Sequence, residues 1–216
     1  MKTAIIIGAT GLVGGQITGK LLNDNRYNLV KIFVRKSTCI KKPKLEAHVV
    51  DFEKIETWKH EMIGDELYSA MGTTIKKAGS KEAQYRIDFT YQYECAKAAC
   101  ENGVGKYLLV SSAGANIKSG NFYLRMKGEL DKKVSELPFQ QLNIFRPSIL
   151  AGERKERRRG EEIGTSVLKF LAKIVPPLRK YRPIEASIVA EAMIKTANRQ
   201  SQNNLMIYEL DQIFQI

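Results

Sequence analysis

The chain has 216 residues, of which 44% are hydrophobic and 27% are charged. This length suits one α/β domain, and the composition excludes wholesale disorder and any need for a disulfide framework or a structural metal. Thirty-five Lys and Arg residues against 23 Asp and Glu residues give a net charge of +12. Such a charge favours anionic partners, among them nucleotide phosphates, nucleic acid and acidic lipid.

Cysteine and histidine are sparse. Cys39, Cys95 and Cys100 form no CxxC pair, and two histidines are too few for a His-rich metal site, so we expect free thiols and no metal. No apolar run reaches the roughly 18 residues that a membrane span needs. The first residues faintly resemble a secretory signal, but they are better explained as a nucleotide-binding turn. We therefore expect a cytoplasmic protein.

Strand and helix patterns alternate over the first two thirds of the chain. Helical spacing predicts helices over 12–22, 82–102 and 122–136, the second closed by Gly103. Apolar runs predict six strands, over residues 3–7, 29–34, 47–52, 65–71, 106–111 and 141–145. Strands separated by helices indicate βαβ units, so the expected fold class is α/β with a doubly wound parallel sheet.

The pattern changes beyond residue 147. Residues 153–162 are strongly charged, and residues 166–175 predict an apolar helix that Pro176 and Pro177 end. A further helix is predicted over 184–198 and a last strand over 205–210. We expect residues 1–216 to form a single domain in which residues 148–216 add a small cap on the substrate side, over the carboxyl edge of the sheet.

A glycine-rich segment, GATGLVG over residues 8–14, lies between the first predicted strand and the first predicted helix. In such a segment the first glycine permits a tight turn, the second lets the backbone approach a pyrophosphate, and the third lets the helix pack against the strand. The free N–H groups of the helix start then face the phosphates. We predict a dinucleotide contact at this segment, made by Gly8, Thr10, Gly11, Leu12, Val13 and Gly14.

The end of the second predicted strand bears on the choice of dinucleotide. A site that prefers NAD usually carries Asp or Glu there, whereas this chain carries Arg35 and Lys36. Arg35 can bind a 2′-phosphate in a bidentate manner, so NADP(H) is predicted over NAD(H). Asp51, followed by Phe52 at the end of the third strand, is placed to accept a hydrogen bond from the adenine amino group. The alternatives are a solvated Arg35 and an Asp51 that only belongs to a turn.

A serine pair and a Tyr–Lys pair carry the candidate chemistry. Tyr123 and Lys127 are four residues apart and so share one helical face, after Ser111 and Ser112 at the end of the fifth strand. A phenol is a poor acid–base catalyst near neutral pH, but a nearby ammonium stabilises the phenolate. We predict that Tyr123 exchanges a proton with a substrate oxygen that Ser112 orients, while hydride moves to or from a nicotinamide held by Lys127. Ser111 is the competing serine, and an exposed Tyr and Lys on a surface helix is the alternative.

With these motifs the chain resembles the short-chain dehydrogenase/reductase superfamily in its atypical, NADP-binding branch, and more narrowly the HIV Tat-interactive protein oxidoreductase group. The segments that carry this resemblance are MGTT over 71–74, KAG over 77–79, VSSAGA over 110–115, YLRMKGE over 123–129, FRPSIL over 145–150 and the charged run 153–157. The resemblance implies a Rossmann fold that carries NADPH, with Ser112, Tyr123 and Lys127 catalytic. It further implies cofactor contacts at Met71, Gly72, Thr73, Ser111, Tyr123, Lys127, Arg146 and Pro147. One departure is that residues 86–91 contain no Asn for the superfamily's catalytic asparagine.

The expected function is therefore an NADP-dependent oxidoreductase that acts on a small carbonyl or alcohol substrate, and a homodimer is a fair expectation. The alternative is an NADP(H)-binding regulator or sensor without turnover, which would bind partners through the basic residues Arg154, Lys155, Arg157, Arg158 and Arg159. The simplest interpretation of these basic residues is a solvated loop, and the alternative is a contact for an acidic protein or lipid surface. Nucleic acid is disfavoured as a partner because no aromatic residues interleave with them. The Tyr123–Lys127 pair favours the enzyme, and epimerase or dehydratase chemistry with the same residues stays open.

Overall fold

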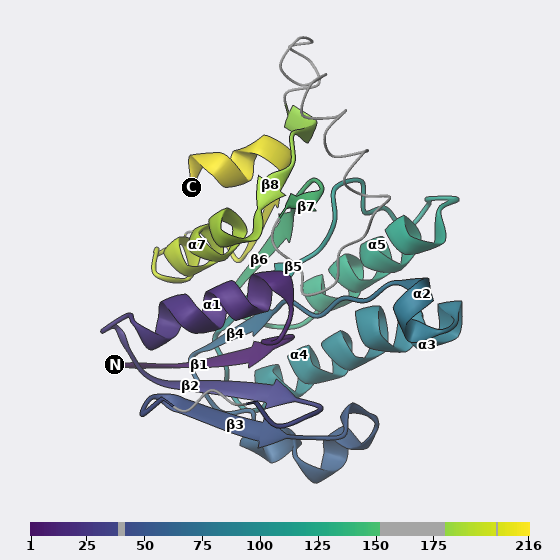
Figure 1. Cartoon of the computed structure of the whole chain (residues 1–216). Coiled ribbons are helices and arrows are strands. Elements are labelled where there is room, and N and C mark those ends of the chain that lie inside the picture. Colours follow the sequence, from purple (N-terminus) through teal and green to yellow (C-terminus); the bar gives the residue numbers. More distant parts are fainter. Residues whose placement is uncertain (39–41, 152–179, 202) are drawn as a thin grey trace.

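The computed structural model describes residues 1–38, 42–151, 180–201 and 203–216. Within them, seven parallel strands form one sheet in the order β3-β2-β1-β4-β5-β6-β9 (Figure 1). These strands are β1 (Lys2–Ile7), β2 (Tyr27–Val34), β3 (Leu45–Val49), β4 (Glu66–Ser69), β5 (Lys106–Val110), β6 (Gln141–Arg146) and β9 (Leu205–Glu209). The strand order reverses between β1 and β4, where a doubly wound sheet opens a ligand crevice at its carboxyl edge. The predicted fold class is confirmed.

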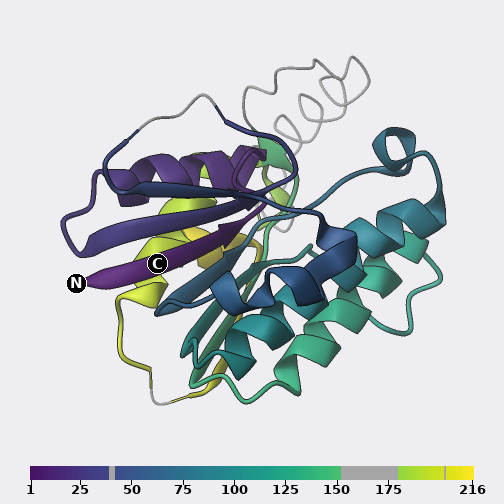
Figure 2. The same cartoon turned by 90° about the horizontal axis from the view of Figure 1, so that it is seen from below.

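Helices cover both faces of the sheet, and Figure 2 shows the sheet between the two layers. One face carries α1 (Leu12–Leu22) and α7 (Ala186–Ala197), and the other carries α3 (Lys81–Tyr85), α4 (Tyr91–Glu101) and α5 (Phe122–Ser135). The short elements are α2 (Ile75–Ala78), the 3-10 turns η1 (Phe52–Thr57), η2 (Lys59–Glu61) and η5 (Leu210–Gln215), the π turn η3 (Arg86–Thr90), and a two-stranded sheet of β7 (Leu150–Ala151) and β8 (Ile184–Glu185).

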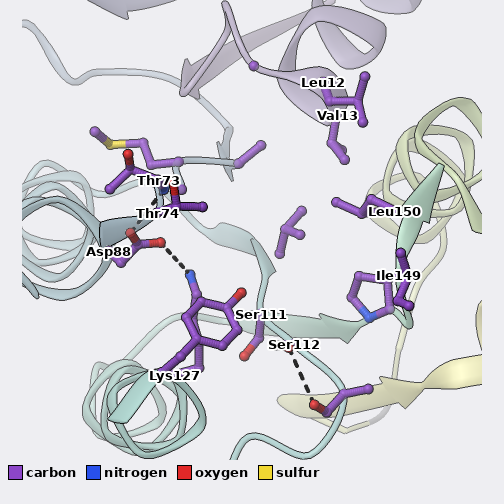
Figure 3. A pocket seen from close by; sticks show the side chains of 18 of the residues that line it. Leu12, Val13, Thr73, Thr74, Asp88, Ser111, Ser112, Lys127, Ile149 and Leu150 are labelled. Atoms are coloured by element: carbon purple, nitrogen blue, oxygen red, sulfur yellow. Dashed lines mark hydrogen bonds and ion pairs between the residues drawn. The ribbon is translucent and has the colours of Figure 1, made fainter. Parts of the chain in front are cut away.

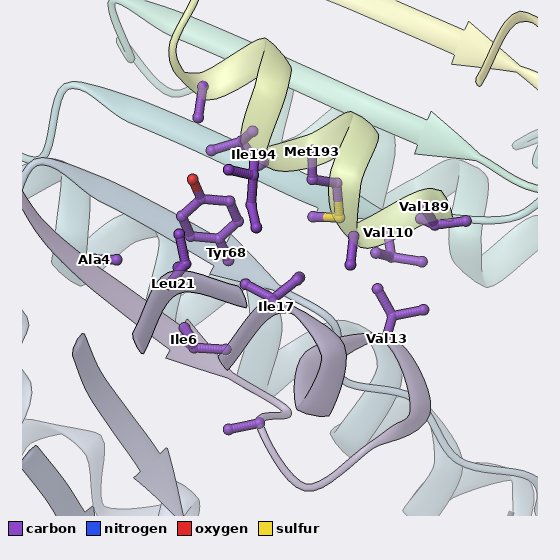
Figure 4. Close-up of a cluster of buried hydrophobic side chains, with 14 of the residues drawn as sticks. Ala4, Ile6, Val13, Ile17, Leu21, Tyr68, Val110, Val189, Met193 and Ile194 are labelled. Carbon is purple, nitrogen blue, oxygen red and sulfur yellow. The ribbon is translucent and has the colours of Figure 1, made fainter. Parts of the chain in front are cut away.

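Two apolar clusters, one on each face, hold the layers together. On the first face, Ile17 of α1 and Met193 of α7 pack over Ile6 of the sheet (Figure 4). On the second face, Leu130 of α5 packs with Ile5 and its neighbours. Successive residues of β1 thus bury opposite faces of the sheet, which is why its sequence is an unbroken apolar run rather than an alternating one. Each such fully buried side chain contributes roughly 1.5–3 kcal/mol to the free energy of unfolding.

Two predicted elements differ from the observed ones. The single helix expected over 82–102 is interrupted by η3, a wider turn that places Asp88 in the protein interior. The third strand ends at Val49 rather than at residue 52, because the Asp51 side chain accepts a hydrogen bond from the backbone N–H of Glu53 and so caps η1 (3.0 Å). Phe52 then turns inward against Trp58.

The described part of residues 148–216 that lies in α7 and β9 belongs to the main fold. Helix α7 packs along α1 because its apolar residues, Val189 and Met193 among them, are fully buried there. Strand β9 pairs with β6 and completes the main sheet. The charged run 153–162, the basic residues 154–159, the helix predicted over 166–175 and Cys39 lie outside the described residues. Cys95 and Cys100, which are described, are free thiols as expected.

Candidate functional site

The turn between β1 and α1 closes so tightly that two of its glycines, Gly8 and Gly14, leave no room for a side chain. Gly8 has φ +79°, and a Cβ atom there would lie 2.5 Å from the carbonyl carbon and oxygen of Ala70 on the adjacent strand end. A Cβ atom on Gly14 would lie 2.1 Å from the carbonyl oxygen of Gly8. The N–H of Gly11 donates to that same Gly8 oxygen (2.9 Å). The glycines therefore let the start of α1 approach the end of β1.

The start of α1 is built to receive an anion. Gly11 is the N-cap residue, it supplies no side-chain hydrogen bond to the helix, and the first turn contains no acidic residue. The first N–H groups of a helix lack partners within the helix, and the helix dipole adds a partial positive charge at this end. A phosphate group fits both features, since it accepts several N–H groups and carries negative charge.

A cleft of about 1690 Å³ opens at the carboxyl ends of the strands, in front of this turn (Figure 3). It exceeds the roughly 300–1,000 Å³ of small-ligand pockets, so it has room for a dinucleotide and a small substrate together. The predicted site residues that line it are Thr10, Gly11, Leu12, Val13, Met71, Gly72, Thr73, Ser111, Ser112, Tyr123, Lys127 and Pro147. Gly8 and Gly14 shape the turn from behind without lining the cleft. Residues far apart in the sequence are thus brought to one site.

Besides Gly8 and Gly14, five predicted cofactor residues lie outside this lining: Arg35, Lys36, Asp51, Phe52 and Arg146. Arg35 and Lys36 are exposed directly after β2. Because Ile7 of β1 lies opposite Phe33 of β2, the chain leaves β2 at Arg35 beside the glycine turn. Asp51 serves as the cap of η1, and Phe52 is buried against Trp58 with ring centroids 5.4 Å apart. Asp51 thus has the turn role that the sequence analysis gave as its alternative, and Phe52 has a packing role that the sequence did not reveal.

Arg146 does not line the cleft, contrary to its predicted cofactor role. Its Nε donates to Asp131 Oδ2 (2.9 Å) and a terminal nitrogen donates to Glu209 Oε1 (2.6 Å). The guanidinium lines a second, smaller cavity of about 320 Å³ instead. Since Asp131 is buried, its charge needs this partner. Arg146 thus ties α5 to β6 and β9.

The predicted catalytic residues lie together at the cleft (Figure 3). Helix α5 starts at Phe122 because Asn121 Oδ1 accepts the N–H of Leu124 (3.1 Å), and this start places Tyr123 and Lys127 one turn apart. Tyr123 is 36% exposed, whereas Lys127 is 2% exposed. The Ser112 hydroxyl donates a long hydrogen bond to the carbonyl oxygen of Ala113 (3.3 Å), which restrains its orientation only weakly.

Asp88 is a site residue that the sequence did not indicate. One carboxylate oxygen, Oδ1, lies 3.4 Å from Lys127 Nζ, and the other, Oδ2, accepts the N–H of Thr73 (2.9 Å). Burial raises the pKa of the Asp88 carboxyl, an effect that the Lys127 ammonium opposes. Burial by itself would lower the pKa of Lys127, but Asp88 raises it above its ordinary value. Nothing in the spacing of residues 86–91 predicts this contact, because it depends on the π turn.

The remaining chemistry-bearing side chains of the described ranges form no metal site: no group of three or more His, Cys, Asp or Glu residues there has the arrangement to hold an ion.

Ser111 is 5% exposed and lies at the base of the cleft, deeper than Ser112. The geometry therefore offers Ser112 as the more accessible hydroxyl.

Comparison with known proteins agrees with the dinucleotide cleft. Residues 8–157 match the family described as NAD(P)H-binding, and the chain belongs to this family. "Protein fmp52, mitochondrial" of Emericella nidulans is 32% identical over 201 residues, which cover 90% of this chain and 86% of the relative. Protein HTATIP2 of Rattus norvegicus is 34% identical over 164 residues, which cover 74% of this chain and 67% of the relative. The predicted family resemblance is confirmed.

Solved structures agree on the fold. The Bordetella bronchiseptica enzyme WbmH in complex with NAD+ superimposes with a TM-score of 0.71 at 14% identity, covering 97% of this chain and 75% of that one. UDP-glucose 4-epimerase of Thermotoga maritima gives a TM-score of 0.67 at 12% identity, covering 99% and 80%.

The predicted cytoplasmic location is contradicted by the relatives, because those of Emericella nidulans, Aspergillus clavatus and Candida albicans are all named mitochondrial. In the part of the chain that the structure describes, no helix combines the length and the apolar character needed to cross a bilayer.

Replacing Gly11 with Asp tests the anion site. The backbone there (φ −80°, ψ 177°) is allowed for an L residue, and a Cβ atom would lie 3.1 Å from the carbonyl oxygen of Gly8. An aspartate N-cap stabilises a helix by only a few tenths of a kcal/mol, on the order of 0.3 kcal/mol, relative to glycine, which offsets this tight contact. The same carboxylate would repel a phosphate, so we expect NAD(P)H affinity to fall about 100-fold or more while thermal stability changes little. Titration calorimetry and thermal melting measure the two quantities. Gly19→Asp, in an open position further along α1, is the control, and equal affinities for both variants would contradict the site.

Proposed function

We propose that the chain is an NADP(H)-dependent oxidoreductase that interconverts a small carbonyl compound and its alcohol. The observation that supports this proposal is that Ser112, Tyr123 and Lys127 line the same cleft as the glycine turn. A protein that only bound the dinucleotide would not need an exposed phenol one helical turn from a buried ammonium.

The residues present fit the dinucleotide. The start of α1 would hold the pyrophosphate through its N–H groups, and the excluded Cβ positions at Gly8 and Gly14 keep that helix start open to it. The loop after β4, at Gly72 and Thr73, would lie along the middle of the dinucleotide, and Pro147 would border the nicotinamide. Lys127 would donate to the ribose hydroxyls. When bound, NADP(H) would supply or accept a hydride at the substrate carbon.

The proton of the reaction comes from this chain. In the direction of reduction, the Tyr123 hydroxyl donates its proton to the carbonyl oxygen, which becomes the alcohol oxygen as hydride arrives at carbon. The Lys127 ammonium stabilises the resulting phenolate, which regains a proton from solvent through its exposed edge. Ser112 exchanges its long bond to Ala113 for a hydrogen bond to the same substrate oxygen and so orients it. Oxidation of the alcohol reverses each transfer.

The preference for NADP(H) is supported by Arg35 and Lys36. They follow β2, the strand next to the glycine turn, and no carboxylate stands at the end of β2. Within the described residues no hydrogen bond or ion pair engages the Arg35 side chain, so its guanidinium is available to a 2′-phosphate. The substrate class proposed here depends on the site alone.

Substitution of Tyr123 by Phe tests the catalytic proposal. We expect the wild-type chain to oxidise NADPH in the presence of at least one member of a panel of small aldehydes and ketones. Tyr123→Phe removes the proton donor, so kcat should fall about 100-fold or more. The NADPH dissociation constant should change less than about twofold, since the ring remains. Tyr181→Phe, which removes another phenol of the cleft lining, is the matched control and should stay active. Loss of NADPH binding in Tyr123→Phe, or full activity, would refute the assigned role.

Substitution of Arg35 by Asp tests the choice of dinucleotide. Loss of a charge-assisted contact and gain of a repulsive carboxylate should weaken NADPH about 10- to 100-fold while leaving NADH within a few fold. Lys97→Asp makes the same change in net charge at an exposed position of α4 and should alter neither affinity. An unchanged ratio of the two dissociation constants in Arg35→Asp would exclude the 2′-phosphate contact.

A further inference from the structure

A single buried carboxylate joins the two walls of the cleft. Asp88, which is 1% exposed, reaches Lys127 on α5 with one oxygen (3.4 Å) and the backbone of Thr73 on the loop after β4 with the other (2.9 Å) (Figure 3). The loop lies so close that a Cβ atom on Gly72 would stand 3.3 Å from Asp88 Oδ1. The carboxylate therefore holds the loop and the helix at a fixed separation.

The π turn is what brings Asp88 to this place. Helix α4 follows the turn directly, and Gln92 Nε2 donates to the backbone carbonyl of Asp88 (2.6 Å). Gln84, on the preceding helix α3, donates to the carbonyl of Thr73 (3.2 Å), so both backbone polar groups of Thr73 are held. Single π turns inside helices often occur at functional sites, because the extra residue redirects a side chain.

Lys127 depends on this carboxylate for its charge. An ammonium that is 2% exposed loses the stabilisation of water and tends to release its proton unless a counter-charge is near. Asp131 and Tyr123 also face Lys127, both from its own helix α5. Asp131, however, is paired with Arg146 of β6 at 2.9 Å. Among the described residues, Asp88 is therefore the carboxylate that forms an ion pair with Lys127.

We propose that Asp88 is a positioning residue: its carboxylate keeps the Lys127 ammonium charged and directed at the cleft, and anchors the loop after β4 beside it. This proposal rests on the proposed function, because it takes Lys127 to act in that reaction. The charge on Lys127 can nevertheless be measured without any turnover, so the two proposals fail in different ways.

The test is an NMR titration of the intact chain with isotope-labelled lysine side chains. The Lys127 signal is identified as the one that Lys127→Met removes. In the wild type we expect it to titrate with a midpoint above that of an ordinary lysine, because the nearby carboxylate favours the charged form. Asp88→Asn keeps the size of the side chain and an acceptor for Thr73 but removes the charge, so the midpoint of the Lys127 titration should fall by about one pH unit or more. Asp88→Glu restores the charge and should restore most of the midpoint.

Asp131→Asn is the matched control, because it removes a second buried carboxylate near Lys127 whose direct partner is Arg146; its shift should be smaller than that of Asp88→Asn. Should Asp88→Asn not fold, the reciprocal measurement decides: in Lys127→Met the labelled Asp88 carboxyl should take up its proton about one pH unit higher than in the wild type. An unchanged Lys127 midpoint in folded Asp88→Asn, or an unchanged Asp88 midpoint in Lys127→Met, overturns the proposal. A wild type without turnover would instead refute only the oxidoreductase proposal.

Discussion

The site depends on the absence of side chains at the turn between β1 and α1. Because a Cβ atom on Gly14 would collide with the carbonyl of Gly8, helix α1 can begin directly at the carboxyl end of β1 only with glycine at that position. This close packing aims the uncapped helix start at the point where the strand order reverses. The same approach lets Ile17 and Leu21 of α1 cover the sheet, so the phosphate site and half of the core share one constraint.

A second constraint is the burial of charged side chains on α5. Lys127 and Asp131 lie one turn apart on α5, both are buried, and each has a partner of opposite charge on another element. The π turn provides Asp88 for Lys127, and the end of β6 provides Arg146 for Asp131. Removing one partner of such a pair typically costs about 3–5 kcal/mol, because the other charge is left buried. Helix α5 is thus held in place by the same ion pairs that fix Lys127 beside the cleft.

Much of this arrangement could be predicted from the sequence, and the parts that could not share a physical reason. The apolar runs of β1 and β5 and the GATGLVG segment act over a few neighbouring residues, so local patterns reveal them. The spacing of Tyr123 and Lys127 likewise needs only one helix. Asp88 and Arg146 are different, since their partners are distant in the sequence and their orientation depends on tertiary packing. For the same reason β9 was foreseen as a strand, whereas its place beside β6 in the main sheet was not.

The most direct test of the account is a calorimetric titration of the unmodified chain with NADPH and, separately, with NADH. We expect one molecule of NADPH to bind per chain with micromolar affinity and NADH to bind more weakly, because the helix start, the cleft and Arg35 then act together. The absence of binding for both dinucleotides would contradict the account, since it would mean that the glycine turn has the geometry of a phosphate site without the function.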